Sequence, residues 1–374
     1  MQPAMDRGLT IGIDSRAAIE EIAGRGRMVR ELLRALAARS DPHRYVLYTR
    51  RAWDEPLDGR FGWRTVAGGD AVWHPRVARL AWRECDVFLA SNSYLTPILT
   101  PLPTATIVYD LVAFDPATPP PLRSRVVERL TLGLAVRRSR ALLAISGATA
   151  DALVARFPAA RDRVEVIPLG VSPVLAVASS GTTSGDAPSP GFVLAVGTLE
   201  PRKNFPRLVE AYARLPLDLQ QAHPLVVVGR LGWETSETLA ALRSLGDRCL
   251  LLGAVSDSEL AELYRRCALF CYPSLAEGFG LPVLEAMAAG AAVLTSDRSS
   301  LPEVGGDAVA YADPTDAADL ERQLEALLRD PDRRAALGRA GAERARGFTW
   351  AQTAALTLRA LERMAASHSA AASQ

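Results

Sequence analysis

Short apolar runs alternate with helical segments through the first half of the chain. A loop through Gly24, Arg25 and Gly26 is predicted after the first run, followed by a helix near Met28–Ala38. Strands that alternate with helices predict a parallel sheet with helices on both faces. The runs lie at Leu9–Ile13, Tyr45–Tyr48, Val87–Leu89, Thr106–Val108, Ala141–Ile145 and Val164–Pro168.

Residues 171–190 interrupt this alternation. The stretch from Ser179 to Gly185 is small and polar, and such a composition cannot build a core, so a linker or loop is predicted there. A capping box at Ser256 and Glu259 predicts a helix further on. The other elements predicted after the linker are strands at Phe192–Val196, Leu225–Val228, Cys249–Leu252, Leu269–Tyr272 and Ala292–Thr295, and helices at Phe205–Arg214 and Leu281–Ala289.

Each half is therefore predicted to be a doubly wound, Rossmann-like α/β domain. Two domains suit the length of 374 residues, because a single core stops growing at roughly 250–300 residues. The expected division is an N-terminal domain over 1–170, a C-terminal domain over 191–350, and a helix over 351–374 that crosses back and ends in a disordered tail. Such sheets bind ligands at the carboxyl ends of their strands, so a cleft between two facing domains is the expected site.

The net charge of +1 hides an asymmetry between the two halves. Residues 1–170 hold 24 arginines and 18 acidic residues, whereas the remainder holds 19 basic and 24 acidic residues. A basic N-terminal half favours an anionic partner, such as a phosphate-bearing acceptor or an anionic membrane surface; an uneven spread of arginines is the simpler alternative. No apolar run approaches the ~18 residues of a membrane span. The start of the chain lacks the pattern of a secretion signal, so a cytoplasmic location is expected.

The cysteines and histidines give no reason to expect a metal site. The four histidines are scattered, and the one Asp-x-Asp sequence, at Asp330–Asp332, is typical of a turn between helices. Buried free thiols explain the cysteines better than a metal site or disulfides, because no Cys-x-x-Cys pair occurs. The cysteines are Cys85, Cys249, Cys267 and Cys271.

The strongest chemical signal is the segment EGFGLPVLE, from Glu277 to Glu285. Gly278 and Gly280 let the backbone approach a ligand closely, and Pro282 suits the first turn of a helix. The N-terminus of that helix offers N–H groups and the positive end of the helix dipole, which favour a diphosphate. The two carboxylates can then reach hydroxyl-rich groups on either side of the phosphates. A helix cap with a solvated glutamate is the alternative interpretation.

With its glutamates separated by seven residues, EGFGLP-x-LEAMA-x-G resembles the signature of the family 4 retaining glycosyltransferases of GT-B fold. The resemblance covers nearly the whole chain, because Gly197–Asn204 resembles the family's donor-phosphate segment, and Leu301–Ala308 and Phe348–Trp350 follow its usual course. Among family members, the chain looks most like the mannosyltransferases of bacterial surface polysaccharide assembly. The resemblance implies a nucleotide-sugar donor, with GDP-mannose the leading candidate, and no cofactor.

Lys203 carries an independent argument. It is the only lysine in the chain, and the other 42 basic residues are arginine. A compact ammonium suits point contact with a diphosphate, whereas arginine favours planar, two-pronged contacts. By resemblance, Arg202 and Lys203 lie beside the donor diphosphate and stabilise the charge that builds on the leaving group. A solvated loop charge is the alternative, and Thr198 stands where the family often has an arginine.

The resemblance implies further donor contacts. Glu277 is expected to contact the donor sugar, Glu285 the nucleotide ribose, and Val255 the base pocket. A Gly-x-Gly pair is weak evidence, which its position after the first strand strengthens. The other expected donor-binding residues are Thr198, Gly278, Phe279, Gly280 and Leu281 in the C-terminal domain, and Gly24 and Gly26 in the N-terminal domain.

The acceptor side rests on Thr106–Leu111, where many relatives carry His-Asp-Leu and this chain has Tyr109 in place of the histidine. A tyrosine hydroxyl can donate a hydrogen bond but is a poor base near neutral pH. Asp110 is a candidate for assisting the incoming hydroxyl, and capping a loop is its alternative role. The segment Trp73–Arg83 has arginines at helical spacing, which suits either contact with anionic lipid or an ordinary packed helix with a solvated arginine face.

The sequence therefore predicts a retaining, metal-independent glycosyltransferase. It would move a hexose, mannose by resemblance, from a nucleotide sugar to a glycan or polyprenyl-linked acceptor. The expected location is the cytoplasm, with peripheral contact at an anionic membrane as an option and no nucleic-acid partner. Two alternatives remain open. One is a nucleotide-sugar epimerase of the same architecture, and the other is a catalytically silent glycosyltransferase-like subunit, which Tyr109 and Thr198 motivate.

Overall fold

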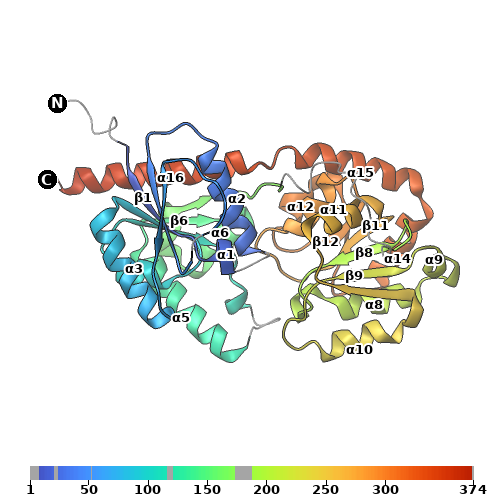
Figure 1. Cartoon of the computed structure of the whole chain (residues 1–374). Coiled ribbons are helices and arrows are strands. Elements are labelled where there is room, and N and C mark those ends of the chain that lie inside the picture. Colours follow the sequence, from blue (N-terminus) through green and yellow to red (C-terminus); the bar gives the residue numbers. More distant parts are fainter. Residues whose placement is uncertain (1–7, 21–23, 52, 116–120, 173–187, 373–374) are drawn as a thin grey trace. The chain divides into compact units, whose positions relative to one another are not determined.

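The computed structural model describes residues 8–20, 24–51, 53–115, 121–172 and 188–372. The chain divides into two compact units. Unit 1 comprises residues 1–170 with 350–374, and unit 2 comprises residues 171–349. Most of the linker predicted at 171–190, and the end of the predicted tail, lie outside the described residues. In Figure 1 each unit consists of a sheet between layers of helices.

Unit 1 is built on a parallel sheet that has seven strands in its described residues, in the order β3-β2-β1-β4-β5-β6-β7. Inner strands such as VFLA and ALLA are apolar throughout, because a parallel sheet is covered on both faces. The strands are β1 (Thr10–Asp14), β2 (Arg44–Thr49), β3 (Phe61–Thr65), β4 (Val87–Ala90), β5 (Thr104–Val108), β6 (Ala141–Ala144) and β7 (Val164–Val166). The helices, with 3₁₀ turns written η, are α1 (Ala17–Glu20), α2 (Arg25–Ala37), α3 (Asp70–Glu84), α4 (Leu95–Leu99), η2 (Val112–Phe114), α5 (Leu122–Arg138), α6 (Gly147–Arg156), η3 (Pro158–Arg163) and α16 (Trp350–Ala372).

The last helix, α16, belongs to unit 1 although it follows unit 2 in the chain. It packs against α2 and against β4, β5 and β6. Leu358 and Leu361 are buried on this side, and the hydroxyl of Thr353 donates a hydrogen bond to the carbonyl of Pro168 (2.5 Å). The helix expected at 351–374 therefore packs on the N-terminal half of the chain.

Unit 2 repeats the architecture with a parallel sheet that has six strands in its described residues, in the order β10-β9-β8-β11-β12-β13. Its core is formed where the buried runs of β8, β9 and β11 meet α8 and α14. The strands are β8 (Val193–Val196), β9 (Leu225–Val228), β10 (Cys249–Gly253), β11 (Leu269–Tyr272), β12 (Val293–Ser296) and β13 (Ala310–Ala312). The helices and turns are η4 (Pro201–Lys203), α8 (Phe205–Arg214), α9 (Leu217–Ala222), α10 (Ser236–Ser244), η5 (Gly246–Arg248), α11 (Asp257–Arg266), α12 (Leu281–Ala288), α13 (Leu301–Gly305), η6 (Gly306–Ala308), α14 (Ala317–Arg329) and α15 (Pro331–Ala345).

These two sheets confirm the predicted α/β class. The capping box is formed at the start of α11, and Asp330 caps α15 at the predicted turn after α14. One prediction is wrong at its edge. The loop through Gly24, Arg25 and Gly26 ends earlier than expected, because α2 already begins at Arg25. Gly24 precedes it with φ +55°, a backbone conformation that side chains with a Cβ rarely adopt.

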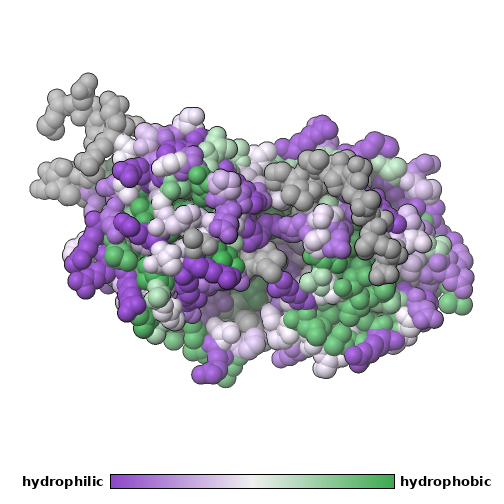
Figure 2. All heavy atoms as spheres, viewed as in Figure 1, coloured by the Kyte–Doolittle hydropathy of each residue, from purple (hydrophilic) through white to green (hydrophobic). Residues whose placement is uncertain are grey.

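The outer surface carries hydrophilic side chains with hydrophobic patches between them (Figure 2). Within the described ranges, no helix has both the length and the apolar character needed to cross a bilayer. All four cysteines are free thiols. Cys271 is buried, and Cys85, Cys249 and Cys267 are partly buried.

Candidate active site

The charged residues of unit 2 that the sequence predicts to bind the nucleotide-sugar donor lie at the carboxyl ends of two neighbouring strands. Arg202 and Lys203 follow β8, and Glu277 follows β11. The chain leaves β8 towards β9 on one side and later returns to β11 on its other side, so a topological switch point lies between β8 and β11. Ligands of doubly wound sheets bind at this place.

Glu277 is the centre of a buried polar cluster at this edge. Its Oε1 accepts hydrogen bonds from Lys203 (2.6 Å), from the hydroxyl of Tyr272 (2.8 Å) and from that of Ser274 (2.6 Å). Its Oε2 accepts one from Arg202 (2.7 Å). The side chain is 8% exposed, so the alternative of a solvated glutamate does not hold.

The cations determine the charge state of Glu277. Burial alone would raise the pKa of its carboxyl, but Arg202 and Lys203 outweigh burial and lower the pKa to about 2. For Lys203 the balance is the reverse. Burial and the repulsion of Arg202 together outweigh the attraction of Glu277, so the pKa of the Lys203 ammonium is lowered. Glu277 is therefore firmly ionised between the two cations.

Arg202 is fixed from both sides. Glu200, a buried carboxylate that sequence reasoning missed, accepts from Nε (3.1 Å) and Nη2 (2.7 Å) of Arg202. Nη1 donates to the carbonyl of Ala276 (2.7 Å) as well as to Glu277. This two-pronged geometry suits a guanidinium. Arg202 therefore links the loop after β8 to the loop after β11. Asn204 adds a second link, because its side-chain amide donates a hydrogen bond to the carbonyl of Pro273 (3.1 Å).

The helix that follows Glu277 is preceded by Gly280, whose backbone conformation favours glycine at this position. Gly280 has φ +99°, and a Cβ there would lie 2.6 Å from a side-chain carbon of Leu301. Its left-handed conformation turns the chain into α12, whose first turn offers N–H groups and the positive helix end to an anion. Glu285 lies within α12, is 3% exposed, and accepts a hydrogen bond from the hydroxyl of Tyr264 (3.3 Å).

The remaining predicted donor residues of unit 2 occupy different environments. Gly278 is buried, and Phe279 is buried with its ring edge-on to Phe348 at 6.0 Å. Thr198 is exposed in the loop after β8. Two more are partly buried: Leu281 opens α12, and Val255 follows β10. All of them lie after the carboxyl ends of strands of unit 2.

In unit 1, the predicted glycines lie at the start of α2. Gly24 is exposed before the helix, whereas Gly26 is buried inside its first turn. Arg25, between them, lies over the ring of Tyr109 at 5.2 Å from the centroid. Burial lowers the pKa of Arg25, but Tyr94, Asp110 and other groups outweigh it and raise that pKa. Arg25 therefore keeps its positive charge at this helix start.

Tyr109 and Asp110 follow β5, also at the carboxyl edge of the sheet. The hydroxyl of Tyr109 donates to the carbonyl of Ser91 (2.5 Å), which ties β5 to the end of β4. Its single proton is therefore used within the fold. The carboxylate of Asp110 accepts from the backbone N–H of Val112 (3.1 Å) and so caps the loop before η2. This contact is the alternative that the sequence left open for Asp110; catalytic roles for both residues stay predictions.

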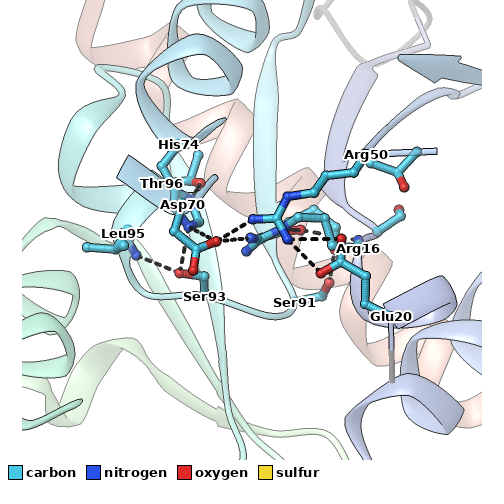
Figure 3. A network of polar contacts seen from close by, with 12 residues as sticks. Arg16, Glu20, Arg50, Asp70, His74, Ser91, Ser93, Leu95 and Thr96 are labelled. Carbon is cyan, nitrogen blue, oxygen red and sulfur yellow. Dashed lines mark hydrogen bonds and ion pairs between the residues drawn. The ribbon is translucent and has the colours of Figure 1, made fainter. Parts of the chain in front are cut away.

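A second charge network, not predicted from the sequence, lies beside the end of β1 (Figure 3). Arg16 is buried and pairs with Asp14 (3.1 Å) and with Asp70 (2.9 Å). Arg50 reaches the same Asp70 (2.5 Å) and also Glu20 (3.0 Å). These residues come from five different elements or loops, so the network holds together the carboxyl edge of unit 1.

His74 lies next to this network and is buried. Its Nδ1 is 2.8 Å from the hydroxyl of Thr96, and its Nε2 is 3.4 Å from that of Ser93. Burial, and then the positive charge of Arg16, lower the pKa of His74 to about 4. The imidazole is therefore neutral at physiological pH, and both of its nitrogens contact side chains of the fold.

The structure brings together Arg202, Lys203 and Glu277 and adds Glu200, Tyr272 and Ser274 to them. Glu200 could have been noticed two residues before Arg202, but nothing in the sequence singles out Tyr272 or Ser274. Among the described residues, no group of three or more histidine, cysteine or acidic side chains is placed to hold a metal ion.

Comparison with known proteins identifies the family. Residues 22–175 match Glycosyltransferase Family 4, and residues 184–344 match Glycosyl transferases group 1. The chain is 32% identical over 304 residues to O-antigen chain mannosyltransferase B of Escherichia coli, covering 77% of each protein. It is 37% identical over 237 residues to the serotype-specific mannosyltransferase WbdA of Escherichia coli, 61% of this chain but only 29% of WbdA.

The solved structures agree on the architecture. The sucrose-phosphate synthase of Thermosynechococcus elongatus superposes with a TM-score of 0.73 at 19% identity, covering 96% of this chain and 100% of that protein. This likeness concerns the fold alone. The comparisons support neither the epimerase nor the silent subunit as an alternative. The chain belongs to the family 4 glycosyltransferases, and it is a glycosyltransferase of GT-B fold.

Proposed function

We propose that this glycosyltransferase moves mannose from GDP-mannose to a glycan or polyprenyl-linked acceptor, with retention of the anomeric configuration and without a metal ion or cofactor. The observation that carries the proposal is the buried cluster of Arg202, Lys203 and Glu277 at the switch point of unit 2. The mannosyltransferase names of the relatives support mannose as the sugar. The proposed location is the cytoplasmic face of a membrane, where a polyprenyl-linked acceptor would be held.

The hydrogen bonds of Glu277 suggest how a donor is recognised. A carboxylate oxygen offers about two lone-pair sites, and Oε1 of Glu277 already accepts from Lys203, Tyr272 and Ser274. A sugar hydroxyl can replace one of them only if that donor finds another acceptor. The diphosphate provides one, because it attracts the ammonium of Lys203 as a point charge. Diphosphate binding and sugar recognition are therefore coupled through Lys203.

In the proposed reaction, the bond from the anomeric carbon to the diphosphate breaks while the acceptor oxygen bonds to that carbon from the same face. The acceptor hydroxyl loses its proton to the departing phosphate oxygen. Arg202, Lys203 and the N-terminus of α12 stabilise the negative charge that grows on the leaving group. These groups supply the charge that a metal ion would otherwise supply.

The test is release of nucleoside diphosphate from a panel of nucleotide sugars, with mannosylated and polyprenyl-linked acceptors. We expect release from GDP-mannose, with a turnover roughly 10²–10³-fold lower for Lys203→Ala and for Glu277→Ala. Arg207→Ala is the matched control, because its side chain is 38% exposed on α8 and, among the residues that the structure describes, its ion pair is with Glu210 of the next turn. The control variant should keep wild-type turnover, and chelation of divalent ions should leave turnover unchanged.

Each part of the proposal can fail separately. Release from a different donor would refute GDP-mannose, and loss of turnover on chelation would refute metal independence. An inverted product anomer in the NMR spectrum would refute retention. Donor binding without release, across the full acceptor panel, would contradict catalysis by this site.

A further inference from the structure

Helix α5 of unit 1 has two apolar faces, and only one of them is covered. Leu132, Ala135 and Val136 are buried, and α5 packs against α4, η2 and β5. A separate set of large aliphatic side chains on the same helix is exposed to solvent. These are Leu122 (64%), Val126 (46%), Val127 (58%), Leu130 (64%) and Leu134 (46%).

The exposed set forms a continuous stripe. At 3.6 residues per turn, its five members fall within an arc of roughly 140°, and the buried face lies on the opposite side of the helix. In Figure 2, hydrophobic side chains lie among hydrophilic ones along the lower edge of unit 1, where Figure 1 places α5.

Positive charge accompanies the stripe. Arg123 near the start of α5 and Arg137 near its end are both exposed, and the helical spacing places both within the arc of the stripe. Arg138 is exposed at the same end. The only acidic residue of α5 is Glu128, which is partly buried. An aliphatic stripe with arginines at both ends is complementary to a bilayer with anionic headgroups, since acyl chains accept the stripe and phosphates accept the guanidinium groups.

We propose that α5, through the stripe Leu122, Val126, Val127, Leu130 and Leu134 and the arginines Arg123 and Arg137, docks unit 1 on an anionic lipid surface. This deepens the proposed membrane location of the enzyme and does not depend on which donor it uses. The alternative surface that the sequence suggested is α3. There Trp73 and Val77 are core residues, and the exposed side combines arginines with Trp82 and one exposed aliphatic residue, Val72, rather than an aliphatic stripe.

The experiment is co-sedimentation of the full chain with vesicles of phosphatidylglycerol and phosphatidylcholine, and with vesicles of phosphatidylcholine alone. We expect binding to the anionic vesicles at low ionic strength and little binding to the neutral ones. Arg123→Gln with Arg137→Gln should weaken binding roughly 30-fold, since each arginine near an anionic surface contributes about fivefold. Val127→Glu with Leu130→Glu should remove binding altogether.

Two controls separate this surface from others. Arg79→Gln with Arg83→Gln makes the same charge change on α3, and we expect it to reduce binding much less than the α5 pair. Hydrogen exchange of the wild-type chain should show protection of residues 122–138 on adding anionic vesicles, which needs no variant. GDP release with a water-soluble acceptor should be unaffected by the α5 changes, so failure of docking is distinguishable from failure of catalysis.

Several outcomes would overturn the proposal. Absence of binding to anionic vesicles would do so, as would equal loss of binding by the α3 and α5 charge pairs. If Val127→Glu with Leu130→Glu instead dissociates a dimer in lipid-free sedimentation equilibrium, the stripe binds a second copy of the chain. If it alters protection of unit 2 without lipid, the stripe is covered by the chain's own second unit.

Discussion

Replacing Lys203 with methionine removes one of the two cations around Glu277 while keeping a side chain of similar length. The carboxylate of Glu277 is 8% exposed and keeps Arg202 on its other oxygen (2.7 Å). Removing one partner of a buried ion pair costs about 3–5 kcal/mol. Because Arg202 remains, we expect the lower end, a loss of about 3 kcal/mol in the free energy of opening unit 2 at neutral pH.

The pH dependence sharpens this expectation. The pKa of Glu277 is about 2 in the folded protein, against an ordinary value of 4.5. A carboxyl with a lowered folded pKa contributes stability that is complete above pH 4.5 and is lost as pH falls towards 2, here about 3 kcal/mol. In Lys203→Met the folded pKa of Glu277 lies closer to 4.5, so less stability remains to be lost. The difference between wild type and variant should therefore shrink as pH falls below 4.5.

The assay is native-state hydrogen exchange of the amides in β11 and α12 at pH 7 and pH 3, which reports local opening rather than unfolding of both units together. Arg207→Met is the matched control, because its exposed pair with Glu210 contributes at most about 1 kcal/mol. A Lys203→Met effect that is the same at both pH values, or no larger than that of Arg207→Met, would refute the reasoning.

Three further expectations follow from single contacts. Glu200→Gln removes a charged partner of Arg202, so steady-state nucleotide release should fall about tenfold, for a loss of ~1.5 kcal/mol. Gly280→Ala should lower the free energy of unfolding by about 2 kcal/mol in urea denaturation, and Gly290→Ala, which has φ +82° but open space, should cost less. The pKa of His74, about 4 against 6.5, should make unit 1 lose about 3 kcal/mol as pH falls from 6.5 to 4. In His74→Gln, native-state hydrogen exchange should show no such loss of stability in unit 1 over the same pH range.

The hydrophobic pattern was sufficient for strands that are buried on both faces. β8, β9 and β11 are four-residue apolar runs with every residue buried, so they stand out in the sequence. β3 is an edge strand with a largely exposed sequence, FGWRT, and β13 has only three residues, so neither gives an apolar signal. The start of α2 was misplaced because two glycines favour a loop locally, whereas packing of Gly26 into unit 1 favours the helix.

Site residues could be predicted only where they belong to one recognisable segment of the sequence. Glu277 and Lys203 belong to recognisable segments, but the contact between them depends on a fold that brings together loops more than seventy residues apart. The roles of Tyr272 and Ser274 arise from that contact and have no local signature. The same limit applies to Tyr109, because a sequence does not show that its hydroxyl donates to a backbone carbonyl.

The geometry also explains why this arginine-rich chain has its one lysine at position 203. The aliphatic stem of Lys203 lies against Gly197, where a Cβ would be 3.5 Å from three of its carbons. The ammonium lies between the hydroxyl of Tyr272 (2.6 Å) and Glu277 (2.6 Å), 5.1 Å from the centre of the tyrosine ring. A guanidinium is planar and needs acceptors spread along one edge. Here the acceptors converge on one point, which a compact ammonium satisfies and an arginine fork does not.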